Sequence, residues 1–340
     1  MITVFGSINM DLIATTARLP KPGETVAGTG FSTAAGGKGA NQALAARRAG
    51  ASVRMAGAVG SDSFAEGALA LLKEAGTDLG LTKTVNEPTG TAHILVGGDG
   101  ENVIVVVASA NATVSEGDAS TAVGKMSAGD TLMLQLEIPA ASVEKALVEA
   151  KRRGIRSVIN IAPLTPEAAR LGRMADIVIA NETEFELLAG KSGIAGAERE
   201  AAMKSLHDET GQTVIVTLGA EGVAAAHQGE IHRARGLTIE PVDTVGAGDT
   251  FCGYLAASPG RGPRLPRCAA PRRGRRVAGL PEAGRATVHS ARLRGRRASL
   301  TATTDFARFR NPDRFWRGND ACRAESTLDS QELAWLLAVF

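Results

Sequence analysis

The first 257 residues alternate between short apolar runs and longer stretches whose apolar positions recur at helical spacing. Short apolar runs bounded by turn residues are typical of buried strands, and apolar positions at i, i+3, i+4 and i+7 are typical of helices. We therefore predict strands at residues 2–6, 53–59, 131–136, 155–160, 176–180, 213–218 and 222–227. We predict helices at residues 39–49, 62–75, 140–153, 181–189, 196–210 and 249–257. This alternation predicts an α/β fold, with a doubly wound, mostly parallel sheet covered by helices on both faces.

Residues 89–107 follow a different pattern. The stretches 91–96 (Thr-Ala-His-Ile-Leu-Val) and 102–107 (Asn-Val-Ile-Val-Val-Val) flank the turn residues 98–100 (Gly-Asp-Gly). Two strand-like stretches around such a turn predict a β-hairpin. Together with the strand-like residues 24–33, the hairpin predicts a small sheet outside the main one.

One glycine-rich turn carries candidate chemistry. Residues 243–252 read Asp-Thr-Val-Gly-Ala-Gly-Asp-Thr-Phe-Cys, a strand-like start, a turn and a predicted helix. The N–H groups of Gly246, Ala247 and Gly248 would lie at a helix N-terminus, which favours anions. Asp249 at that position could take a proton from a hydroxyl group while the N–H groups bind a transferred phosphoryl group. An ordinary strand–turn–helix connection, with Asp249 as a cap, explains the same residues without any catalysis.

A second polar cluster lies near the N-terminus. Residues 6–11 (Gly-Ser-Ile-Asn-Met-Asp) follow a predicted strand, and residues 36–42 (Gly-Gly-Lys-Gly-Ala-Asn-Gln) open a helix. Asn9 and Asp11 offer amide and carboxylate groups to a polyol, and Asn41 lies one helical turn beyond the glycines, where it could face the same cleft. The glycine run is not a P-loop, which would need Gly at 32 and Ser or Thr at 39, and the Rossmann glycine pattern is absent.

Taken together, these segments resemble the PfkB carbohydrate kinase family, and within it the ribokinase group. The resemblance runs from residue 2 to about residue 257. Its matching segments are residues 6–11, 22–25, 36–42, 181–184, 217–222 and 243–253. It implies a ribokinase-like kinase domain over residues 1–257, with a β-sheet lid formed by segments at about 10–35 and 89–107.

The resemblance implies a role for each matching residue on the sugar side of the site. Asp249 would be the catalytic base, and Gly246, Ala247 and Gly248 would form the anion hole. The sugar contacts would be Asn9, Asp11, Gly37, Lys38, Asn41, Glu137 and Asp249. Two of these residues have simpler explanations, since Lys38 could be a solvated cation at a helix start and Glu137 a plain acid at a strand end.

The resemblance also implies a nucleotide and metal side. The residues expected to contact ATP are Asn181, Thr217, Gly219, Gly222 and Gly248. Glu184 would help to hold Mg²⁺ through water, and Asp243 and Val245 would hold a monovalent cation, usually K⁺. Asn181 and Glu184 also fit a helix N-cap with a capping box, and both explanations can hold together. The five histidines show no ligand spacing, and we expect them to be structural or on the surface.

The implied activity is the ATP-dependent phosphorylation of a sugar, with D-ribose converted to D-ribose 5-phosphate. The forms of residues 36–42, Asn9 and Asp11 point to ribose, while other sugars and nucleosides remain the family's alternatives. The implied partners are ribose, ATP and a second copy of the chain joined through the lid.

The composition indicates in which part of the cell this activity is expected. An apolar content of 44% allows a sizeable core, and no apolar run reaches the length of a membrane span. The chain starts directly with a predicted strand rather than with a signal peptide. Its three cysteines lack metal spacing and indicate a reducing compartment, so we expect a cytoplasmic protein without a membrane partner.

The last part of the chain has a different composition. Residues 258–340 contain 17 arginines, no lysine and 7 acidic residues, a net charge of +10, whereas residues 1–257 carry a net charge of −8. A basic tail can be a nucleic-acid arm, but arginine, glycine, proline and alanine in excess are typical of a GC-rich gene read out of frame. We predict that residues 258–340 are an aberrant, poorly ordered tail, and we expect no nucleic-acid partner. A natural arginine-rich or disordered arm is the alternative.

The genetic code allows a test of this prediction. Moving the reading frame of residues 280–290 forward by one nucleotide permits Cys-Leu-Lys-Pro-Gly-Ala-Gln-Pro-Ser-Ile-Pro. That sequence is similar to the closing segment of ribokinases, which contains Gly-Ala-Gln-Pro-Ser. We therefore predict a frameshift near residues 257–260. Because that segment contributes to the family's nucleotide site, a second hypothesis is an inactive, sugar-binding remnant.

Overall fold

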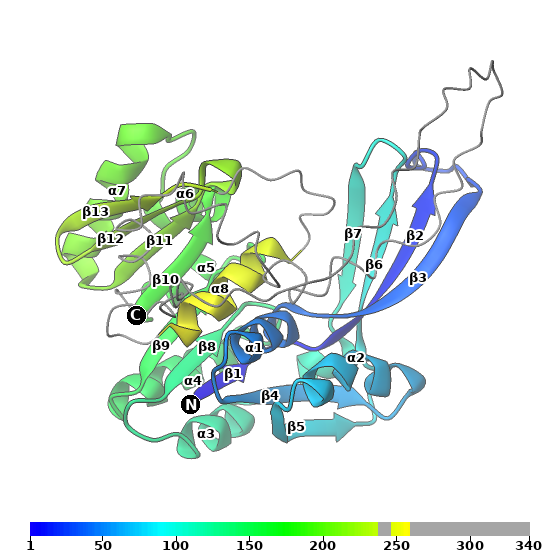
Figure 1. Ribbon diagram of the computed structural model, residues 1–340, viewed down its shortest axis with the longest axis horizontal. Coiled ribbons are helices and arrows are strands. Elements are labelled where there is room, and N and C mark those ends of the chain that lie inside the picture. Colours follow the sequence, from blue (N-terminus) through cyan, green and yellow to red (C-terminus); the bar gives the residue numbers. More distant parts are fainter. Residues whose placement is uncertain (237–245, 259–340) are drawn as a thin grey trace, which may run out of the picture.

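The computed structural model describes residues 1–236 and 246–258, and a nine-stranded sheet forms its centre (Figure 1). The strand order is β13-β12-β11-β10-β9-β8-β1-β4-β5, parallel throughout except for the antiparallel pairs β11–β12 and β12–β13. The strands are β1 (Ile2–Phe5), β4 (Val53–Gly60), β5 (Asp78–Val85), β8 (Thr131–Leu134), β9 (Arg156–Asn160), β10 (Ile177–Asn181), β11 (Thr213–Thr217), β12 (Val223–His227) and β13 (Glu230–Ala234). All seven strands predicted for the main sheet lie in it, which confirms the predicted fold class.

Helices cover both faces of this sheet, and alternating strand residues build a separate core on each face. In β8, Leu132 and Leu134 pack into one core and Met133 into the other. Helices α3 to α7 contribute to the first core, and α1, α2 and α8 contribute to the second. The helices are α1 (Lys38–Arg48), α2 (Ser63–Glu74), α3 (Glu116–Gly124), α4 (Ala140–Arg152), α5 (Ala168–Gly172), α6 (Glu182–Ala189), α7 (Gly196–Thr210) and α8 (Ala247–Ala257).

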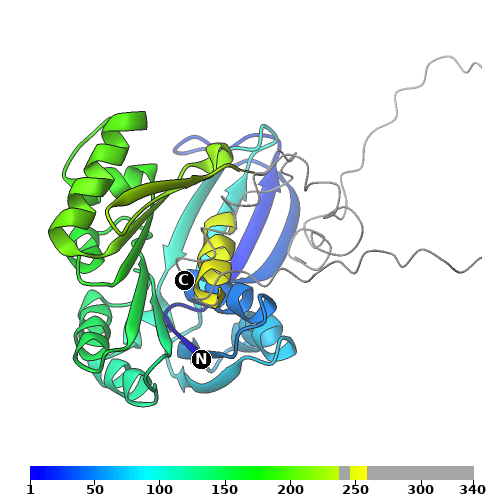
Figure 2. The same cartoon turned by 60° about the vertical axis from the view of Figure 1, so that its left-hand side comes forward.

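A smaller four-stranded sheet stands away from the main sheet (Figures 1 and 2). It consists of β3 (Gly28–Gly36), β2 (Asn9–Thr16), β6 (Gly90–Val96) and β7 (Asn102–Val107), in that spatial order. Strands β6 and β7 form the predicted hairpin, in which Val96 pairs with Asn102 across the turn. The smaller sheet is therefore confirmed, with β2 as a further strand between β3 and β6.

The topology brings several helix starts to one edge of the main sheet. In a parallel sheet the carboxyl ends of the strands lie at the same edge, and ligands of such folds bind there. Helix α8 lies along α1 (Figures 1 and 2), so the first turns of these two helices are neighbours. Across the described stretches of the chain, we find no helix with the length and apolar character needed to cross a membrane.

Candidate active site

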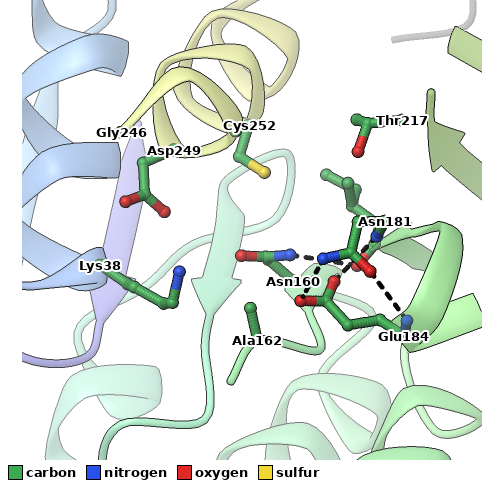
Figure 3. Close-up of a pocket in the computed structure, with 11 residues that line it drawn as sticks. Lys38, Asn160, Ala162, Asn181, Glu184, Thr217, Gly246, Asp249 and Cys252 are labelled. Carbon is green, nitrogen blue, oxygen red and sulfur yellow. Dashed lines mark hydrogen bonds between the residues drawn. The ribbon is translucent and has the colours of Figure 1, made fainter. Parts of the chain in front are cut away.

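A pocket lies where the carboxyl ends of β9, β10 and β11 meet the N-terminal turns of α1, α6 and α8. Figure 3 shows Lys38 and Asp249 on one side of it, and Asn181, Glu184 and Thr217 on the other. Seven residues predicted from the sequence line this pocket: Lys38, Asn181, Glu184, Thr217, Gly246, Gly248 and Asp249. The sequence therefore identified residues that are far apart in the chain but share one cavity.

The first turn of α8 has the geometry of an anion site. Gly246 is the N-cap, with a left-handed backbone (φ 78°) that favours glycine. The Thr250 N–H donates to the Gly246 carbonyl at 2.9 Å, so the N–H groups of the intervening residues have no partner within the helix. Gly246 and Gly248 both line the pocket. The helix therefore presents backbone donors and its positive end to the cavity.

Asp249 lies in the same turn with only 6% of its surface exposed. Its Oδ1 accepts a hydrogen bond from Gln42 Nε2 at 3.0 Å, and its Oδ2 lies 3.4 Å from the donor Asn41 Nδ2. Both partners come from α1. The carboxylate is thus held at the pocket wall by two amide groups, although Asn41 itself is not among the residues that line the pocket.

Lys38 begins α1 and lines the pocket. Burial by itself would lower the pKa of Lys38, but the carboxylates of Asp249, Glu137 and Glu184 outweigh burial and raise it above its usual value. A cation at the start of a helix opposes the helix dipole, so these carboxylates stabilise it there. The partly buried Lys38 thus lies among carboxylates at the pocket, which favours the predicted site cation over a solvated side chain; its contact with the sugar stays a prediction.

Glu137 follows β8 and reaches the start of α1. Its Oε2 accepts hydrogen bonds from Ser7 Oγ at 2.5 Å and from the Lys38 backbone N–H at 3.0 Å. The carboxylate therefore satisfies one of the helix's first donors. It is not among the pocket-lining residues, but it lies beside Gly37 and Lys38.

Asn9 and Asp11 lie at the start of β2, with 2% and 6% of their surfaces exposed. The Asn9 side-chain oxygen accepts a hydrogen bond from Asn111 Nδ2 at 2.7 Å. The Asp11 carboxylate lies against Gly36, where a Cβ atom would come within 2.1 Å of its Oδ1. Both predicted sugar-side residues thus lie against the glycines that precede α1, and neither lines the pocket.

Asn181 and Glu184 form the capping box that the sequence pattern allowed. The Asn181 side chain accepts from the Glu184 N–H at 2.8 Å, and the Glu184 carboxylate accepts from the Asn181 N–H at 2.8 Å (Figure 3). Asn181 Nδ2 also donates to the second carboxylate oxygen at 3.0 Å. Burial raises the pKa of Glu184, outweighing the Asn181 N–H and the Lys38 ammonium, which lower it, and the Asp249 carboxylate adds to the rise.

The chemistry of Glu184 fits magnesium held through water. Mg²⁺ keeps several of its waters and commonly needs one or two protein carboxylates together with substrate phosphates. Both oxygens of Glu184 already accept hydrogen bonds, and the described residues contain no group of three or more His, Cys, Asp and Glu side chains arranged to bind a metal. A single carboxylate of this kind suits a hydrated ion and not a dehydrated protein cage.

The predicted nucleotide side follows β11. Thr217 ends the strand and lines the pocket, and a short 3₁₀ turn, Gly219–Glu221, comes next. The Leu218 N–H donates to the Gly222 carbonyl at 2.8 Å, which closes this loop. Gly219 and Gly222 thus shape the loop but do not line the cavity. Asp243 and Val245, and residues 259–340 of the predicted tail, lie outside the described residues.

Four pocket residues were not predicted from the sequence: Asn160, Ala162, Ile179 and Cys252. Asn160 accepts from Gln42 Nε2 at 3.2 Å and donates to the Ile179 carbonyl at 3.2 Å. Burial, and then the Asp249 carboxylate, raise the pKa of the Cys252 thiol. A detectable signal existed for two of them, since Asn160 ends a predicted strand and Cys252 follows Asp249 by three helical positions.

Known proteins resemble this chain over most of its length. A family model described as pfkB family carbohydrate kinase matches residues 1–280. A ribokinase of Haemophilus influenzae is 39% identical over 256 residues, which is 74% of this chain and 83% of that protein. A ribokinase of Mus musculus is 38% identical over 260 residues, which is 75% of this chain and 80% of that protein.

A solved structure gives the same result for the fold. The ribokinase of Arabidopsis thaliana, solved in complex with ribose and ATP, matches with a TM-score of 0.66 and 31% identity. The match covers 76% of this chain and 85% of that one. The chain therefore belongs to the PfkB family of carbohydrate kinases and is a sugar kinase.

Proposed function

We propose that this protein transfers the γ-phosphoryl group of ATP to the 5-hydroxyl of D-ribose, which yields D-ribose 5-phosphate and ADP. The observation that carries the proposal is the buried Asp249 carboxylate in the first turn of α8, held by Asn41 and Gln42. A carboxylate and the backbone donors of a helix start face one cavity there. That pairing suits the transfer of an anionic group to a hydroxyl.

In this reaction the ribose O5 forms a bond to the γ-phosphorus while the bond to the β–γ bridging oxygen breaks. The proton of O5 passes to Asp249, which acts as the general base. The N–H groups of Gly246, Ala247 and Gly248 stabilise the charge on the transferred group, because they are oriented before the reaction begins. Asn9, Asp11, Gly37, Lys38, Asn41 and Glu137 bind the sugar and orient its hydroxyl groups.

The nucleotide lies on the opposite side of the cavity in this proposal. Asn181, Thr217, Gly219 and Gly222 contact ATP, and Glu184 holds Mg²⁺ through water. When bound, Mg²⁺ lowers the negative charge of the nucleotide phosphates. The monovalent-cation site at Asp243 and Val245, with K⁺ as its ion, stays a prediction.

The replacement Asp249→Asn tests this mechanism. It keeps the shape of the side chain and removes the proton acceptor, so we expect turnover to fall by about 10²–10⁴-fold while ribose binding persists. ATP-dependent formation of ribose 5-phosphate and calorimetric titration with ribose measure the two properties. Asp208→Asn, an exposed replacement on α7, is the matched control. Near-normal turnover of Asp249→Asn would refute the assignment.

The smaller sheet supports a further part of the proposal. Its strands β3 and β7 expose large apolar side chains, namely Phe31, Val103, Ile104, Val105, Val106 and Val107. Contiguous exposed apolar groups mark contact surfaces. We propose that this sheet closes over the sugar as a lid and joins two copies of the chain as a homodimer.

A second candidate function is an inactive sugar-binding remnant. It is favoured by the arginine-rich residues from 261 onward, which do not contain the family's Gly-Ala-Gln-Pro-Ser segment in readable form. Comparing the chain with a frame-corrected form separates the two candidates. An active enzyme gives ATP-dependent turnover in both forms, whereas a remnant binds ribose and gains turnover only after correction.

A further inference from the structure

We propose that Gln42 and Gln135 are positioning residues that orient the Asp249 carboxylate, with Gln135 acting only through Gln42. The inference rests on the proposed role of Asp249 as the general base. Gln135, directly after β8, donates from Nε2 to Gln42 Oε1 at 2.6 Å. Gln42, on α1, donates from Nε2 to Asp249 Oδ1 at 3.0 Å. Gln135, Gln42 and Asp249, from separate elements, thus form a chain of two hydrogen bonds that ends at the base, which we call the relay.

The order of donors and acceptors in this relay allows one orientation of Gln42. A primary amide has one accepting oxygen and one donating nitrogen. Because Gln135 donates to the oxygen of Gln42, the nitrogen of Gln42 faces Asp249 and also reaches Asn160 Oδ1 at 3.2 Å. The reverse orientation would place a carbonyl oxygen against a carboxylate. The Asp249 carboxylate, which can only accept, therefore sets the orientation of Gln42, and Gln135 supplies the donor that satisfies the Gln42 oxygen in that orientation.

Both glutamines are completely buried, with 0% of their surfaces exposed. Within the described part of the chain, Gln135 Oε1 has no hydrogen-bond partner. This oxygen lies against Gly6, where a Cβ atom would come within 2.0 Å of it. A buried, unpartnered carbonyl is unfavourable, and an apolar side chain would fill the position without that penalty. The donor that Gln135 supplies to Gln42 explains why the polar residue is there.

The relay also distinguishes the two oxygens of Asp249. Gln42 holds Oδ1, whereas the contact that the described residues give Oδ2 is the longer 3.4 Å approach of Asn41 Nδ2. With Oδ1 fixed, the carboxylate cannot rotate freely, and Oδ2 is directed to the side of Asn41, a predicted sugar contact. We infer that Oδ2 accepts the substrate proton and that Gln42 keeps it at the reacting position.

A carbon-13 NMR experiment on the full chain tests the relay without ligand or turnover. The aspartate carboxyl carbons are labelled, and the Asp249 resonance is assigned by its absence in Asp249→Asn. We expect this resonance to move in Gln42→Met and in Gln135→Met. Gln212→Met is the matched control, because Gln212 is also buried with an unpartnered Oε1 among the described residues, and its side-chain Nε2 donates to the Gly172 and Ala175 carbonyls. A resonance that stays in place in both relay variants overturns the proposal.

Kinetics with ATP and D-ribose test the consequence. A small misplacement of a catalytic group can cost about 10²-fold in rate, so we expect kcat of Gln42→Met to fall about 10- to 100-fold, with KM for ribose changed less than about twofold. Gln135→Met should lose less. The double variant should be no slower than Gln42→Met, because Gln135 acts through Gln42. Additive losses, or an altered KM with an unchanged kcat, would overturn the relay.

Two controls keep the outcomes separate. Thermal melts establish that each variant is folded, and if Gln42→Met does not fold, Gln135→Met carries the test because it does not touch Asp249. Normal turnover by Asp249→Asn would show that Asp249 is not the general base, and it would refute the proposed mechanism together with the relay. If Asp249→Asn is inactive while Gln42→Met keeps full kcat, the relay alone is refuted.

Discussion

Replacing the buried residue Asn111 gives a sharp test of how the fold orients Asn9, one of the predicted sugar contacts. It lies in the 3₁₀ turn Ser109–Thr113 with 1% of its surface exposed. Its side chain accepts from the Ile8 N–H at 2.9 Å and donates to the Ile8 carbonyl at 3.1 Å and to Asn9 Oδ1 at 2.7 Å. Asn111→Leu keeps the branching and the number of heavy atoms of the side chain and removes all three hydrogen bonds.

The size of the effect follows from the groups that are left behind. A buried polar group without its partner costs about 1–3 kcal/mol. Three such groups would remain, so with partial relaxation we expect a loss of about 3–5 kcal/mol, a large share of the stability of a typical domain. Ser142→Ala is the graded control, because Ser142 is also buried but makes one hydrogen bond, from Oγ to the Val114 carbonyl at 2.8 Å.

The assays are urea unfolding and ribose titration. We expect Asn111→Leu to lower the unfolding free energy by several times as much as Ser142→Ala, and to weaken ribose binding because Asn9 loses the donor that orients it. Ser142→Ala should bind ribose normally. A loss for Asn111→Leu no larger than that of the control, or unchanged ribose affinity in the folded variant, would refute the reasoning.

Three further predictions concern charge and surface. Because burial raises the pKa of Glu184, its ionised form destabilises the ligand-free fold at neutral pH. Glu184→Gln should therefore raise the melting temperature at neutral pH while lowering activity. The difference in melting temperature between the two proteins should vanish below pH 4.5, where the carboxyl is protonated in both the folded and the unfolded chain. Lys38→Gln leaves three neighbouring carboxylates without their cation, so kcat/KM should fall about 10-fold or more in steady-state assays. Val105→Lys, which places a charge on the exposed face of β7, should convert a dimer to a monomer in analytical ultracentrifugation, and an unchanged mass would contradict a lid-mediated dimer.

The main sheet was predictable because its strands are short apolar runs buried on both sides. The strand Thr213–Thr217, for example, is buried at its first four positions, and its sequence Thr-Val-Ile-Val-Thr favours a strand. Several elements were not predicted from the sequence, and two of them, α3 and β5, show why. Helix α3 contains glycine, serine and threonine, and β5 is an edge strand with partly exposed residues. Tertiary packing, more than local preference, determines these two elements.

The site was predictable only in part, for a reason that lies in the topology. Asp249, Lys38, Glu184 and Gln42 all stand in recognisable motifs, but the contact of Gln42 with Asp249 spans 207 positions of sequence and is not visible in either motif. Their contact depends on α8 lying along α1. Gln135 reaches Gln42 because β8 lies next to β1 in the sheet, an adjacency that no local pattern encodes. Long-range strand order therefore determines the partners of the base.

The charges of the pocket explain why both its Asp249 side and its Glu184 side need positive groups when a nucleotide binds. Asp249 and Glu184 are both buried, and in the described part of the chain the ammonium of Lys38 is near both carboxylates. A polyanionic nucleotide entering this cavity would be repelled by the carboxylates unless positive groups outweigh them. The backbone donors at the start of α8 and the ammonium of Lys38 supply part of that charge, and a hydrated cation held by Glu184 would supply the rest. In the proposed mechanism each carboxylate thus has a group that offsets its charge beside phosphate: Lys38 near Asp249, and the hydrated Mg²⁺ that we predict near Glu184.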